Sequence, residues 1–119
     1  MNLPAYSLQI LCIIPGPSCE LFSVTIDKKQ IVDELKDAIK TKISGTLANI
    51  DAYNLTLYNI NINALDKDQY TEGVNTLAQN LSTLHKLNPA IPMGTVFPSG
   101  PLDQMIEILV EVPTSESLK

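Results

Sequence analysis

The fold is decided by one stretch of the chain, residues 22–40, which reads FSVTIDKKQIVDELKDAIK. Its apolar residues first recur at every second position over residues 22–26, a period of two that predicts a β-strand. The spacing then changes to about 3.6 residues, because the next apolar positions are Val32, Leu35 and Ile39. A strand followed directly by an amphipathic helix is therefore the centre of the predicted fold.

The charges of the helical segment agree with this interpretation. Acidic side chains lie near its start, between Asp33 and Asp37, and Lys40 and Lys42 lie near its end, as the helix dipole favours. Gly45 follows at a position where a left-handed cap is expected. The first turn, in contrast, is not preceded by a Ser, Thr, Asp or Asn that would cap it.

A second strand is expected before this stretch. Apolar residues alternate along the chain from Tyr6 to Ile14, and the sequence Pro-Gly-Pro-Ser at residues 15–18 then ends the strand. The alternating segment that ends at Ile26 follows at once. The two strands and their short turn predict a β-hairpin.

A third strand is expected from Leu55 to Tyr58. The apolar phase flips from Ile60 onward, so that either a bulge occurs near Asn59 or the chain leaves the sheet there. Apolar residues at helical spacing follow in a polar background. We interpret about residues 60–83 as an insertion that carries a short helix.

The last part of the chain is expected to be extended. Four prolines between residues 84 and 101 leave room only for short extended pieces. A clear strand is expected over residues 105–112, with Ile106 and Ile108 on one face and Leu109 on the other. A proline then ends this strand.

The order of these elements predicts an α+β fold, the ubiquitin-like β-grasp. Its helix covers one face of a mixed four- to five-stranded sheet, in which the first and last strands run parallel at the centre. We expect one domain over residues 1–113, with one main helix and the short helical insertion at about 60–83. Residues 114–119 are expected to be a polar tail or linker.

Composition excludes several classes of partner. The 119 residues carry 13 acidic and 8 basic side chains, a net charge of −5, and every basic residue is Lys. Nucleic acids are recognised by clustered positive charge and phosphates by Arg, so we expect no nucleic acid as partner.

The longest apolar run, residues 10–14, is far shorter than the ~20 residues of a membrane span. The start of the chain lacks the regions of a signal peptide, so any export signal is expected to be unconventional.

The chain offers few groups for catalysis or metal binding. Cys12 and Cys19 are the only cysteines and His85 the only histidine, whereas a structural zinc site takes four ligands. The sequence contains no GxSxG, Walker or HExxH motif and no Gly-Gly pair for conjugation. We therefore expect no enzyme, no catalytic residue, no metal and no cofactor. The two cysteines are either free thiols or a disulfide.

Two surfaces are candidates for protein contacts. The first is the sheet face away from the helix, where four apolar side chains are expected to lie together, at Leu11, Ile13, Tyr58 and Leu109. Alternatively, the insertion at 60–83 folds over this face and buries it.

The second candidate surface is the strand of the hairpin that is expected at the edge of the sheet. Its outer residues are Leu21, Ser23 and Thr25, and Glu20 and Asp27 are its only charges. Natural edge strands are usually protected by Lys, Pro or bulges. We expect this edge, or the apolar face, to mediate self-association as a homodimer or partner binding by strand addition.

Several motifs together resemble a known family. The segments Leu11–Ile14, Phe22–Ile26 and Val32–Lys40 resemble the start of the Crinkler effector header domain, whose helix reads close to VDDLKDAIK. Leu55–Tyr58 lies where this family carries LFLAK or an LxLY-like variant, and Ile106–Pro113 resembles its closing HVLVxxP-like motif. The matching motif positions are Leu55, Thr56, Leu57, Tyr58, Ile108, Leu109, Val110 and Pro113.

The resemblance implies an N-terminal module of a secreted effector that acts inside a host cell, in the cytoplasm or nucleus. Such a module is ubiquitin-like, takes part in trafficking or translocation and contacts host proteins, while other domains carry the toxic or nuclear activity. Two departures, Ile106 in place of His and the missing Ala-Lys after Leu57, fit a fungal member better than an oomycete one. The alternative is an intracellular ubiquitin-like adaptor without a role in secretion.

Overall fold

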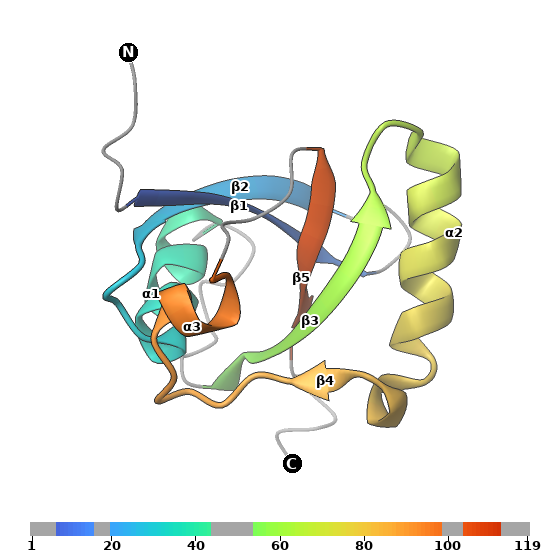
Figure 1. Cartoon of the computed structure of the whole chain (residues 1–119). Helices are drawn as coiled ribbons and strands as arrows, with labels where there is room; N and C mark the ends of the chain where they lie inside the picture. The colour runs from blue at the N-terminus through green and yellow to red at the C-terminus, as the bar shows by residue number, and fades with distance from the viewer. Residues whose placement is uncertain (1–6, 16–19, 44–53, 99–103, 113–119) are drawn as a thin grey trace.

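A computed structural model describes residues 7–15, 20–43, 54–98 and 104–112. These residues form one five-stranded mixed sheet in the order β2-β1-β5-β3-β4, with helices packed against it (Figure 1). This is the predicted α+β architecture, consistent with a β-grasp domain. No helix in the described part of the chain is long and apolar enough to cross a membrane.

The predicted hairpin is confirmed. Strand β1 (Ser7–Ile14) pairs antiparallel with β2 (Glu20–Asp27), so that Ile10 lies opposite Val24. Even-numbered apolar residues of both strands are buried together, as the period of two predicts. Strand β2 forms one end of the sheet.

The predicted parallel pair at the centre of the sheet is also confirmed. Strand β5 (Met105–Glu111) runs parallel to β1, with Cys12 opposite Ile108. On its other side β5 pairs antiparallel with β3 (Thr56–Asn63). The short strand β4 (His85–Lys86) pairs with β3 and forms the second end of the sheet.

Helix α1 (Val32–Lys42) begins without a side chain cap from its N-cap residue, Ile31, as its sequence predicts. The carboxylate of Glu34 instead accepts hydrogen bonds from the Ile31 N–H at 3.2 Å and from the Gln30 side chain at 3.0 Å. Two further N–H groups of the first turn donate to the carbonyls of residues 89 and 91. The free donors of the helix end are thus satisfied by the Pro-rich segment. Gly45, the predicted cap, lies outside the described residues.

Helix α1 covers one face of the sheet and builds the first of two cores. Its apolar stripe lies in one cluster with the inward residues of the central strands; the fully buried members of this cluster include Ile10, Cys12, Val32, Leu35, Ile39, Leu57 and Ile108. The predicted packing of the helix stripe on the sheet is therefore confirmed.

Helix α2 (Lys67–Ala78) builds the second core on the opposite face. It begins at Asp66, whose carboxylate accepts hydrogen bonds from the N–H groups of residues 68 and 69 at 3.0 and 3.2 Å. Its buried residues Tyr70 and Val74 cluster with side chains of the three central strands. A short 3₁₀ turn, η2 (Leu81–Thr83), follows. The sheet is thus covered on both faces.

Two bulges explain how the strands serve both cores. Between β3 and β5, Asn59 pairs with Ile108 and Ile62 pairs with Ile106, so β3 has one more residue than β5 between these two pairs. This extra residue confirms the predicted bulge near Asn59. The chain does not leave the sheet there, because β3 continues to Asn63.

The second bulge corrects a prediction. Ile106 and Ile108 were expected on the same face of the sheet. However, they pair with Leu11 and Cys12, which are adjacent in β1, so β5 has one extra residue between the two pairs. An extra residue in one strand reverses the direction of the side chains beyond it. Ile106 therefore lies in the second core with Leu109, while Ile108 lies in the first.

The prediction that residues 84–101 hold only extended pieces is also wrong. Residues Met93–Val96 form a single helical turn, α3, that begins after Pro92. Proline can precede a helix without loss, because the first N–H groups of a helix have no partner within it. The turn places Met93 and Phe97 in the first core, where they are 0% and 6% exposed.

Candidate functional site: the β2 edge

The apolar face predicted from sequence is not an open surface. Ile13 and Leu109 are 0% exposed and Tyr58 is 7% exposed, while Leu11 is half-buried. The alternative, that the 60–83 segment folds over this face, is confirmed, because α2 places its buried side chains in the same cluster. The expectation of exposure was wrong because a face that is free of the main helix was covered by a second one. A protein-interaction role for these side chains stays a prediction.

Tyr58 carries one polar contact of this second core. Its hydroxyl donates a hydrogen bond of 2.9 Å to Oε1 of Glu111, which lies on the neighbouring strand β5. Burial raises the pKa of Tyr58 above its ordinary value, and the hydrogen bond and negative charge of Glu111 raise it further. The pair therefore ties β3 to β5 and keeps the phenol protonated.

The family-motif positions meet in the same pair of strands. Leu57 lies opposite Val110, and Tyr58 lies opposite Leu109. All the described motif residues except the half-buried Thr56 are buried, so their observed role is packing. Pro113, the last motif position, lies outside the described residues.

The second candidate, strand β2, is at the end of the sheet as predicted. Asp27 shows to which side of β2 the main-chain N–H and C=O groups point. Its N–H donates to Oε1 of Gln30, and its carbonyl accepts from the Gln30 N–H, both at 3.0 Å. Both groups of Asp27 thus point away from β1. Because main-chain groups of alternate residues in a strand point the same way, those of Thr25 and Ser23 also face the open edge.

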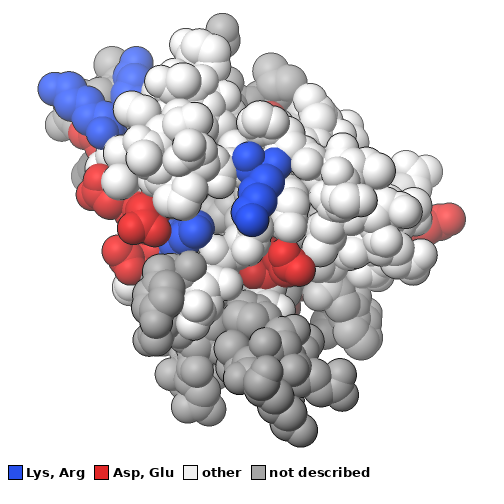
Figure 2. Space-filling view, turned by 90° about the horizontal axis from the view of Figure 1, so that it is seen from below, with Lys and Arg blue, Asp and Glu red and all other residues white. Residues whose placement is uncertain are grey.

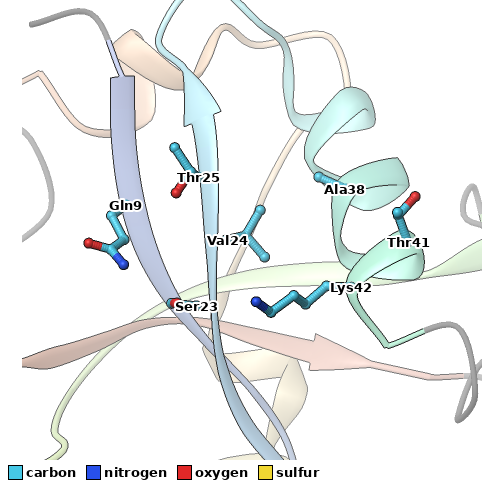
Figure 3. Close-up of a pocket in the computed structure, with 7 residues that line it drawn as sticks. All are labelled: Gln9, Ser23, Val24, Thr25, Ala38, Thr41 and Lys42. Atoms are coloured by element: carbon cyan, nitrogen blue, oxygen red, sulfur yellow. The ribbon is translucent and has the colours of Figure 1, made fainter. Parts of the chain in front are cut away.

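A groove runs between this edge and helix α1. It has a volume of about 530 Å³ and is lined by Gln9, Ser23, Val24, Thr25, Ala38, Thr41 and Lys42. Figure 3 shows Val24 extending from β2 toward α1, and Lys42 extending from α1 toward β2. Val24 and Ala38 belong to the apolar packing at its floor.

The role of α1 in this groove was missed by sequence analysis. Lys42 was identified as a charge that suits the end of a helix, and not as a residue that lies beside β2. Its position beside β2 depends on how α1 lies across the sheet, and the periodicity of the helix does not encode that direction.

The described cysteine and the histidine do not line the groove. Cys12 is a free, fully buried thiol whose pKa is raised by burial, which makes it unreactive. Cys19 lies outside the described residues. His85 is exposed on β4, at the opposite end of the sheet. Within residues 7–15, 20–43, 54–98 and 104–112, no three His, Cys, Asp or Glu side chains gather to hold a metal ion.

The charged residues on one face of the molecule are of both signs. Figure 2, which views it from below, shows lysines and acidic side chains next to each other at the left, and separate charged side chains at the centre and right of a largely uncharged surface. On this face the described residues form no continuous basic stripe of the kind that binds nucleic acid.

Comparisons with known proteins agree with the motif pattern. The sequence profile of the Crinkler effector protein N-terminal domain matches residues 8–111. Crinkler effector protein 1 of Rhizophagus irregularis is 35% identical over 118 residues, which cover 95% of this chain and 24% of that protein. Crinkler effector protein 108 of Phytophthora sojae is 41% identical over 51 residues, which cover 43% of this chain and 6% of that protein. The chain thus spans a quarter or less of these relatives, and it belongs to the family of Crinkler effector N-terminal domains.

Proposed function

We propose that this domain serves as a delivery and protein-contact module of a secreted effector that acts inside host cells, and that it has no catalytic activity of its own. The observation that carries the proposal is the family match, which spans residues 8–111 and thus includes all five strands except the first residue of β1. Host proteins are the proposed partners. The cytoplasm or nucleus of the host is the proposed destination.

The described side chains support a contact role better than a chemical one. A nucleophile needs a base within hydrogen-bond reach, yet Cys12 is buried in β1 while His85 lies on β4. Among the described residues, the β2 edge of the sheet and the groove beside it are instead available for contacts. Such an edge recognises extended polypeptide chains.

Delivery is tested with the full-length gene product, fused at its C-terminus to one fragment of a split fluorescent protein. Host cells that express the other fragment become fluorescent when the effector arrives in them. A matched chimera replaces residues 1–113 with an unrelated folded domain of similar size. We expect host-cell fluorescence from the native protein and its loss from the chimera.

Two outcomes contradict the proposal. Equal fluorescence from both proteins shows that residues 1–113 are not needed for delivery. Retention of the native protein inside the producing cells supports the alternative, an intracellular ubiquitin-like adaptor without a role in secretion.

A further inference from the structure

Within the described part of the chain, the outer edge of β2 is unpaired and can receive an extended chain. Ser23 and Thr25 direct their main-chain groups away from β1, and no other strand of the described sheet pairs with β2. An extended peptide can satisfy these groups with a ladder of hydrogen bonds. The middle of the strand, residues 21–26, carries no charge that would oppose such pairing.

The groove beside the edge defines what the added chain should carry. Val24 and Ala38 provide an apolar floor, which suits an aliphatic side chain. Lys42 provides a positive charge at its wall, and no ion pair joins its ammonium group to a carboxylate of the described residues. The groove therefore lacks the negative charge that would complement it.

We propose that the β2 edge and the α1 groove bind an extended peptide of a partner protein that carries an aliphatic residue and a carboxylate two positions apart. Side chains two positions apart point to the same face of a strand, so both reach the groove. The aliphatic residue packs on Val24 and Ala38, and the carboxylate pairs with Lys42. This inference rests on the proposed function, because it names the chemistry of the partner that a contact module would take.

A second copy of this chain is a poorer occupant. In β2 itself the carboxylates lie at the two ends, Glu20 and Asp27, whereas Lys42 lies beside the middle of the strand. An added β2 strand therefore brings no carboxylate to Lys42. An antiparallel dimer through β2 would also place Lys42 of both copies on the same face of the joined sheet, where like charges repel.

The test uses two synthetic seven-residue peptides. The first is Thr-Val-Thr-Asp-Thr-Val-Thr, which presents valine and aspartate on one face, and the second replaces aspartate with asparagine. Each is titrated into the ¹⁵N-labelled 119-residue chain while amide shifts are recorded. We expect shifts centred on Leu21, Ser23 and Thr25, and roughly two- to five-fold weaker binding of the asparagine peptide, as is typical of one exposed ion pair.

Two variants test the two halves of the site separately. Ser23→Pro removes one outward N–H of an edge strand, a position where proline is tolerated, and we expect binding to fall about ten-fold or more. Ser23→Ala keeps the N–H and is the matched control. Lys42→Glu changes an exposed residue of the last helical turn. We expect it to reverse the preference, so that a third peptide, Thr-Val-Thr-Lys-Thr-Val-Thr, binds better than the aspartate peptide.

The proposal is overturned if no β2 amide shifts, if Ser23→Pro binds as well as Ser23→Ala, or if Lys42→Glu leaves the preference unchanged. Light scattering on the same samples detects dimers through β2, and dimers that exclude the peptide also overturn it. The delivery assay is independent of this titration. Peptide binding without delivery contradicts only the proposed function, and delivery without peptide binding contradicts only this inference.

Discussion

The second core under α2 makes a quantitative prediction for Leu109→Ala. Leu109 is 0% exposed and packs in the cluster that contains Tyr58 and Val74. Truncating a fully buried leucine costs about 2–5 kcal/mol, from lost transfer energy and from the cavity left behind. We expect the free energy of unfolding to fall by about 3 kcal/mol, a large share of the roughly 5–15 kcal/mol that holds a domain together.

Urea unfolding followed by far-UV circular dichroism measures this change. Leu65→Ala is the matched control, because Leu65 is 69% exposed and its truncation should change stability by no more than about 0.5 kcal/mol. A loss of about 3 kcal/mol corresponds to a melting temperature lower by roughly 10–15 °C in a domain of this size. Equal stability of the two variants would refute the reasoning, since it would mean that Leu109 lies on an open face without α2 above it.

Three further predictions concern single polar or reactive groups. Tyr58→Phe should lower the free energy of unfolding by about 1 kcal/mol near pH 7, because it removes the hydrogen bond to Glu111. The folded-state pKa of Tyr58 is raised above 10, so the difference in stability between the two proteins should be fully present below pH 10 and disappear as the pH rises through that pKa. A difference that stays constant with pH contradicts this prediction. In a Cys19→Ser background, Cys12 should react with a thiol reagent only after unfolding, and equally fast labelling of folded and denatured protein would disprove its burial. Glu34→Ala should cost about 1 kcal/mol in thermal unfolding because it removes the hydrogen bonds that the Glu34 carboxylate accepts from the Ile31 N–H and the Gln30 side chain. Asp37→Ala, an exposed control, should cost less, and equal losses contradict this role of Glu34.

Periodicity predicted the parts of the fold that depend on neighbouring residues. The hairpin, helix α1 and the parallel centre follow from where the period changes from two to about 3.6 and back, because each element must bury its own apolar face. The bulge near Asn59 could also be predicted, since a change of apolar parity inside a strand requires either an extra residue or a departure from the sheet.

The parts that were predicted wrongly depend on contacts between distant segments. The alternation of Ile106 and Ile108 is regular in sequence, and only the register against β1 shows that a bulge separates them. The burial of Leu109 depends on α2, whose docking the sequence left open as one of two alternatives. The one-turn helix α3 forms in a Pro-rich segment and buries Met93 in the first core, among residues distant in the sequence.

The sequence predicted the β2 edge of the candidate site but not the groove beside it. The edge position of β2 follows from hairpin order, because the first strand pairs with the last and leaves the second strand outside. The groove needs the placement of α1 over the sheet, so its residues, Lys42 above all, were identified only in the structure.

The central structural claim is that β1 and β5 run parallel in the middle of a sheet whose outer strand is β2. Backbone nuclear Overhauser effects in the labelled chain test this most directly. We predict contacts between the main chains of Cys12 and Ile108 in a parallel pattern, contacts of Leu57 with Val110 in an antiparallel one, and none that join β2 to a strand other than β1. Antiparallel contacts between β1 and β5, or a strand inserted on the open side of β2, would contradict the account.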